Sequence, residues 1–185
     1  MSRKDYKAIL GFSDRWFTLG VGTEETLTLA GWAYEASGDD NGEHYRYGAF
    51  LRYLSQHRPL APSVAEALYE LGNADPDYAM GGNIMADIVD LPECPSSVIA
   101  KALISDRQHL VRKVNRNRLL SELQSSITAE TFDRLFHDGD GVVHLGLLKH
   151  VNLSQEQLQL LAEQGANKQI RRMATAMLGQ QNKLV

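Results

Sequence analysis

The most constraining feature of the chain is a pattern that recurs four times in its last two-thirds. Each copy has a short amphipathic helix, a turn and a second helix, and the first helix begins at a small polar residue or a proline. The copies begin near Pro62, Ser96, Thr128 and Ser154, in steps of 34, 32 and 26 residues. Repeats of this length are typical of stacked helical hairpins, in which each unit contacts mainly its neighbours. The pattern therefore predicts a platform rather than an enclosed reaction chamber.

Two further helices are predicted before the repeats. Thr23 precedes two glutamates, as an N-cap residue does, and the helix that it opens ends near Ser37. Residues 43–56 place four apolar side chains at i, i+3, i+4 and i+7, which is the spacing of an amphipathic helix. No stretch alternates with period two, so no strand is predicted.

These patterns together predict an all-α fold. We expect a short α-solenoid of irregular antiparallel helical hairpins over residues 59–185. Residues 1–58 form an acidic, aromatic helical cap at its N-terminal end, and the two segments make one continuous structural unit.

Three local expectations can be checked against a structure. Asp75, followed by a proline, is expected to cap the second helix of the first repeat. The pair Gly81-Gly82 lies inside that helix and indicates either close helix packing or a local break. Trp16 and Trp32 are expected in the core of the N-terminal cap, where an exposed part of either could anchor an interface.

Composition limits the class of protein. Hydrophobic residues make up 43% of the 185 residues, which favours a folded chain over a disordered one. No run of 18 apolar residues is present, and the N-terminus does not resemble a signal peptide. Cys94 is the one cysteine, so no intrachain disulfide is possible and a cytoplasmic location is expected. The oligomeric state is not predicted.

Charge is unevenly divided along the chain. Residues 1–90 hold 7 Lys and Arg against 14 Asp and Glu, a net charge of −7. Residues 91–185 hold 12 against 9, a net charge of +3. The N-terminal half is therefore acidic and the C-terminal half mildly basic, within a total of −4.

Two segments carry a resemblance to known helical repeats. Val111-Arg112, followed by Val114 and Asn117, is similar to the second helix of HEAT-type repeats and of leucine-rich repeat variants, and so is Ile170-Arg171 with Met173-Ala174. The segments 96–103 and 154–162 resemble the first helix of such units. The resemblance implies architecture and no activity. Some leucine-rich repeat variants bind an iron–sulfur cluster through several cysteines. This chain has one cysteine, so that feature is not expected here.

Basic residues recur at equivalent positions of the second helices. In such repeats these helices usually line the concave face, so the side chains are expected to lie along one groove. An alternative is that they pair with neighbouring acids and cap helix ends. The candidate partner-binding residues are Arg107, Arg112, Lys113, Arg116, His144, Arg171 and Arg172, with Arg118 enlarging the patch.

A groove of this kind suits carboxylates or phosphates, because arginine offers a fixed fork of donors. We expect a protein–protein interaction or scaffold module that binds an acidic partner protein, and the composition also permits an immunity or antitoxin-type inhibitor of a toxin. Weak binding of nucleic acid is an alternative, which a pI of about 5.8 disfavours. No membrane association is expected.

The alternative from another class is a metal-dependent hydrolase. His137-Asp138 resembles the paired His-Asp of metal-dependent phosphohydrolases, but that chemistry needs further ligands on adjoining helices, and none has a recognisable spacing. Cys94 has no neighbouring cation to activate it. The sequence therefore predicts no enzyme, no cofactor and no metal site.

Overall fold

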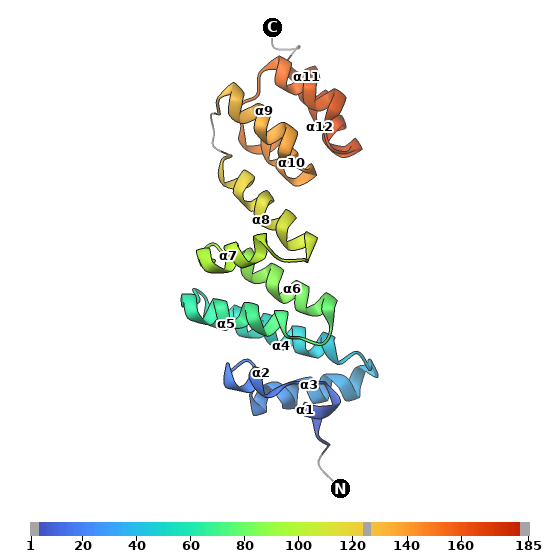
Figure 1. Cartoon of the computed structure of the whole chain (residues 1–185). Helices are drawn as coiled ribbons and strands as arrows, with labels where there is room; N and C mark the ends of the chain where they lie inside the picture. The colour runs from blue at the N-terminus through green and yellow to red at the C-terminus, as the bar shows by residue number, and fades with distance from the viewer. Residues whose placement is uncertain (1–3, 124–126, 182–185) are drawn as a thin grey trace. The chain divides into compact units, whose positions relative to one another are not determined.

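The structure is a computed structural model that describes residues 4–123 and 127–181, with residues 150 and 181 described by their backbone alone. The described residues form twelve α-helices and no strand (Figure 1). The prediction of an all-α fold is confirmed.

The chain divides into two compact units, Met1–Val111 and Arg112–Val185. The first contains α1 (Tyr6–Ile9), α2 (Asp14–Thr18), α3 (Glu24–Ser37), α4 (Gly42–His57), α5 (Pro62–Asn73), α6 (Tyr78–Val89) and α7 (Ser96–Leu103). The boundary lies within α8 (Gln108–Ser121), and the second unit continues with α9 (Ala129–Asp138), α10 (Gly141–His150), α11 (Gln155–Gln164) and α12 (Lys168–Gln181). The cap at residues 1–58 and the repeats at residues 59–185 were predicted on other grounds, and that division stays a prediction.

Several helices begin at the predicted capping residues. The Thr23 hydroxyl accepts a hydrogen bond from a first-turn N–H of α3 at 3.0 Å, and Thr128 does the same for α9 at 3.1 Å. Ser154 and Gln157 form a reciprocal capping box at the start of α11. Such caps depend on residues a few positions apart, which is why the sequence locates them.

The cap of α6 differs from the prediction. Asp77, not Asp75, accepts a hydrogen bond from the Met80 N–H, at 2.6 Å. The Asp75 carboxylate is occupied by Arg46 of α4, whose Nε and Nη2 lie 3.2 and 3.0 Å from its two oxygens. Arg46 also donates to the Leu10 carbonyl at 2.6 Å, and both charged side chains are buried. This contact fastens α4 to two turns of the first unit.

The glycines of α6 permit a close approach to α5. The helix is continuous from Tyr78 to Val89, so the local break is excluded and close packing is the correct alternative. A Cβ on Gly72 of α5 would lie 2.8 Å from the Gly81 carbonyl oxygen and 2.9 Å from Ile84 Cγ2. A Cβ on Gly81 would overlap the Gly72 carbonyl oxygen. The two backbones therefore touch where side chains would keep them apart.

The two tryptophans have different environments. Trp16 is 1% exposed and packs edge-on against Phe12, with ring centroids 5.4 Å apart, as expected for a core residue. Trp32 is 66% exposed, so its predicted core position is wrong. The outward face of α3 carries it into solvent.

The second unit has its own hydrophobic core. Helices α9 to α12 each contribute buried apolar side chains, and α11 packs closely against α12. The core includes Phe132, Leu135, Phe136, Val143, Leu147, Leu158, Leu161, Ile170 and Ala174. This core fixes the orientation of the polar side chains described next.

Candidate binding surface

His144 is buried, with 3% of its surface exposed. The backbone N–H of Ala166 lies 3.1 Å from Nδ1, and because an N–H can only donate, Nδ1 is the acceptor. The proton is then on Nε2, which donates to the Phe136 carbonyl at 2.9 Å. The ring also stacks on Phe136 at 5.1 Å. The expectation of an exposed His144 is wrong, because this side chain links α10 to the end of α9 and to the α11–α12 turn.

Arg107 is also buried, and it lies in the first unit. Its guanidinium donates to the Tyr78 carbonyl and lies 3.7 Å from the centre of the Tyr78 ring. A Cβ on Gly82 would come within 2.9 Å of Arg107 Nη1, so the guanidinium occupies space that the glycine leaves open. The prediction that Arg107 contributes to an exposed patch is wrong for this reason.

Arg116 and Arg171 are half-buried and engaged. Arg116 Nη2 lies 2.6 Å from Oδ2 of Asp140, the residue that caps α10. Burial raises the pKa of Asp140, but Arg116 and two backbone N–H groups lower it, and the net result is a pKa below the usual value. Arg171 donates to the Gly165 carbonyl at 2.7 Å, which caps the end of α11. Both arginines fit the alternative interpretation, in which basic residues pair with acids and cap helices.

Three predicted residues remain. Arg112 and Arg172 are exposed, and Lys113 is half-buried. Across residues 112–123 and 127–181, five exposed Lys and Arg side chains have no ion-pair partner among the described residues: Arg112, Arg118, Lys149, Lys168 and Arg172. The sequence interpretation missed Lys149 and Lys168, although their helix assignments alone could have included them.

Charge in the second unit is sorted by helix. Residues 112–121 of α8, together with α10 and α12, hold 8 Lys and Arg and no Asp or Glu. The intervening helices α9 and α11 hold 5 Asp and Glu and one Arg. The acids of the second unit therefore lie mainly on the first helix of each hairpin and its cations on the second.

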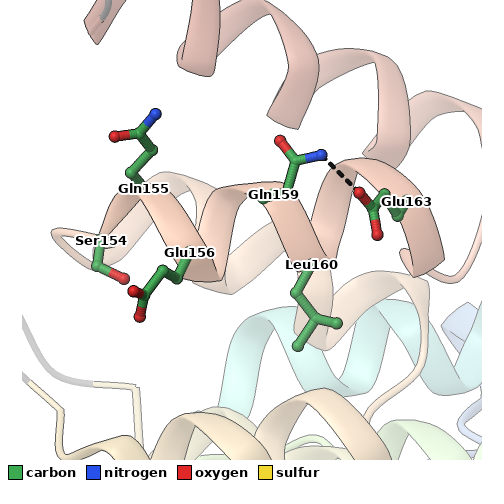
Figure 2. A pocket seen from close by; sticks show the side chains of 6 residues that line it. All are labelled: Ser154, Gln155, Glu156, Gln159, Leu160 and Glu163. Carbon is green, nitrogen blue, oxygen red and sulfur yellow. Dashed lines mark hydrogen bonds between the residues drawn. The ribbon is translucent and has the colours of Figure 1, made fainter.

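A shallow depression on α11 is a poor match to an acidic partner. It is lined by Ser154, Gln155, Glu156, Gln159, Leu160 and Glu163, all from one helix face (Figure 2). Gln159 donates to the Glu163 carboxylate at 2.5 Å, as the dashed line in Figure 2 marks. Its charged side chains are two glutamates and no cation, so it would repel carboxylates.

The candidate metal-ligating and nucleophilic residues do not form a site among the described residues. His137 and Asp138 are exposed at the end of α9, and no three His, Cys, Asp or Glu side chains among the described residues are grouped to hold a metal ion. Burial, followed by Glu93 and Asp90, raises the pKa of the Cys94 thiol to about 11. At neutral pH such a thiol is almost entirely protonated and is a weak nucleophile.

Comparisons with known proteins give no match: no family model, no curated protein and no solved structure is similar to this chain. In the described part of the chain, no helix is both long and apolar enough to cross a bilayer.

Proposed function

We propose that the chain is a helical-repeat interaction protein whose basic second helices bind the acidic surface of another protein. The observation that carries the proposal is the distribution of charged residues within residues 112–185. The charged side chains of α8, α10 and α12 are all Lys or Arg, whereas those of α9 and α11 are mainly Asp and Glu. A surface with one sign of charge speeds the association of a partner with the opposite charge and weakens the binding of partners with the same charge.

The architecture proposed with this function is a short HEAT-like α-solenoid. The helix–turn–helix pairs at the predicted positions support it, and so does the packing of α5 on α6 and of α11 on α12. In such repeats the second helices line the concave face, which would place the basic helices on one side of the array. An inhibitor of the immunity or antitoxin type is a narrower version of the same proposal.

The distribution of the cations favours a macromolecular partner over a small anion. The five exposed cations without an ion-pair partner among the described residues come from three helices, whereas a phosphate or carboxylate site needs donors that converge on one point. A protein partner fits better than nucleic acid, because nucleic-acid-binding domains are strongly basic as a rule and this chain has a net charge of −4.

The test is affinity capture from native lysate with Arg112→Glu/Arg172→Glu as bait. Each reversal exchanges an attractive surface charge for a repulsive one, at about 1 kcal/mol, so two reversals weaken binding about 30-fold. Both side chains are exposed, so the melting temperature should stay within about 2 °C of wild type.

The matched control is Arg15→Glu/Arg58→Glu, which makes the same charge change at two exposed positions of the first unit. We expect the control bait to recover the same acidic protein as wild type and the test bait to lose it. Equal recovery by both baits, with unchanged melts, would refute the assignment of binding to the basic helices.

A further inference from the structure

An apolar groove lies between the C-terminal part of α8 and the outer face of α10, entirely within the second unit. Its volume is about 420 Å³, within the usual size range of binding pockets. It is lined by Leu120, Leu123, Val142, Leu145, Gly146 and Lys149. Val142 is 46% exposed, and the three leucines are half-buried, so the groove presents apolar surface to solvent.

Gly146 explains how the groove forms. A Cβ at this position would overlap Leu123 Cδ1 and lie 3.4 Å from Leu120 Cδ2, so the glycine lets Leu120 of α8 and Leu123, two residues beyond the end of α8, reach the α10 backbone. Val142 and Leu145, from the same helix as Gly146, also line the groove. The groove therefore forms because α8 and α10 approach each other closely at Gly146, which has no side chain.

The charges around the groove are unbalanced. None of the described residues that line it is acidic, and the two nearest acids in the sequence are occupied: Glu122 pairs with Arg134, and Asp140 pairs with Arg116. Lys149 lines the groove and has no ion-pair partner among residues 4–123 and 127–181. The apolar lining and the Lys149 ammonium group are together complementary to an apolar segment that carries carboxylates.

The basic character continues along α8. Lys113 and Arg116 precede Leu120 by seven and four residues, which places all three on one face of the helix. Lys113 is therefore about 10 Å along the helix axis from the groove, at 1.5 Å per residue. Arg116 already pairs with Asp140, so these side chains contribute to the positive field along α8 rather than to the proposed contacts in the groove.

We propose that this groove binds an amphipathic acidic helix of the partner protein. Apolar side chains at i, i+3 and i+4 of that helix pack on Leu120, Leu123 and Val142, and its flanking carboxylates pair with Lys149. This inference rests on the proposed function and identifies which segment of the partner is recognised.

The probe is a fluorescein-labelled synthetic peptide with leucine at helical spacing on one face and glutamate on the other. Two control peptides carry the same residues in scrambled order, or lysine in place of glutamate. Fluorescence anisotropy gives the affinity, and methyl resonances of the protein report where the peptide lies. We expect the first peptide to bind, the scrambled peptide to bind at least about tenfold more weakly, and the lysine peptide not to bind.

Two variants test the groove itself. Val142→Glu introduces a repelling carboxylate near the start of α10, where the helix dipole favours it, and should weaken peptide binding at least about tenfold. Lys149→Glu should weaken binding about tenfold if the pair is formed in the complex. The matched controls are Ile104→Glu, at an 86% exposed apolar residue of the first unit, and Arg15→Glu, at an exposed basic residue of the same unit. Both controls should bind the peptide within about twofold of wild type.

The outcomes separate the two proposals. Methyl shifts at Leu120, Leu123 and Leu145, lost in Val142→Glu and retained in the controls, support the groove. Binding that survives both groove variants but is lost in Arg112→Glu/Arg172→Glu overturns the groove and leaves the proposed function standing. Equal affinity for the lysine peptide, or no binding of the glutamate peptide, also overturns the groove. Lysate capture then decides the proposed function on its own.

Discussion

Replacing Gly72 with alanine tests the packing of α5 on α6 against a matched position. The new Cβ would lie 2.8 Å from the Gly81 carbonyl oxygen and 2.9 Å from Ile84 Cγ2, both closer than ordinary van der Waals contact. The helices must separate by about half an ångström, and overpacking of this kind costs about 1–3 kcal/mol. The helix propensity of alanine returns at most about 1 kcal/mol. The expected net loss is about 1–2 kcal/mol.

Gly48→Ala is the control, because it makes the same chemical change in α4 of the same unit. Gly48 is exposed, has no positive φ, and a Cβ there would meet nothing within 4 Å. Alanine should therefore stabilise this helix by about 0.5–1 kcal/mol. The two variants should differ by about 1.5–3 kcal/mol, with opposite signs relative to wild type.

Thermal and urea unfolding, followed by circular dichroism, measures both variants. Near this chain length a change of 1 kcal/mol corresponds to about 2–4 °C in melting temperature. Gly81→Ala, whose Cβ would overlap the Gly72 carbonyl, should be at least as destabilising as Gly72→Ala. If Gly72→Ala stabilises the protein as much as Gly48→Ala does, the close approach of the two helices is refuted.

Two further predictions concern the second unit. His144→Ala should destabilise it by about 3 kcal/mol in urea unfolding, because the Ala166 N–H and the Phe136 carbonyl lose their partners and a cavity forms; a loss below about 1 kcal/mol would contradict the buried position. The pKa of Asp140 is lowered in the folded state, so its contribution to stability is complete above its unfolded pKa of about 3.9 and is lost as the pH falls through the lower folded value. Asp140→Asn should accordingly lose stability at pH 7 and show a shallower decline below about pH 4, whereas Asp133→Asn, at an exposed position of α9, should retain the wild-type profile.

Local signals in the sequence predicted much of the secondary structure. Thr23, Thr128 and Ser154 were identifiable as caps because the groups that they bind lie within one turn of the chain. Asp75 was assigned the wrong role because its partner, Arg46, is 29 residues away and nothing in the local pattern shows it. The period of the apolar residues therefore identifies helices better than it identifies long-range polar contacts.

The binding surface was predicted less well, for a related reason. The sequence grouped His144 with arginines by its position in the repeat, but a neutral imidazole can be buried where an arginine needs more partners. Its two partners, Phe136 O and the Ala166 N–H, are backbone groups that no side-chain pattern indicates. Lys149 was missed because it is not at an equivalent position in the repeat, although it lines the apolar groove.

Charge reversal tests most directly whether the basic second helices recognise an acidic partner, because the proposal predicts whether each reversal weakens or strengthens binding. The measurement is the affinity of the acidic protein captured from lysate for Arg112→Glu/Arg172→Glu and for Asp133→Lys/Glu163→Lys, whose substituted acids lie on α9 and α11. We predict that reversing the cations weakens binding about 30-fold and that reversing the acids leaves it unchanged or strengthens it. Equal weakening by both pairs of substitutions, or no effect of reversing the cations, would contradict recognition of an acidic partner by the basic second helices.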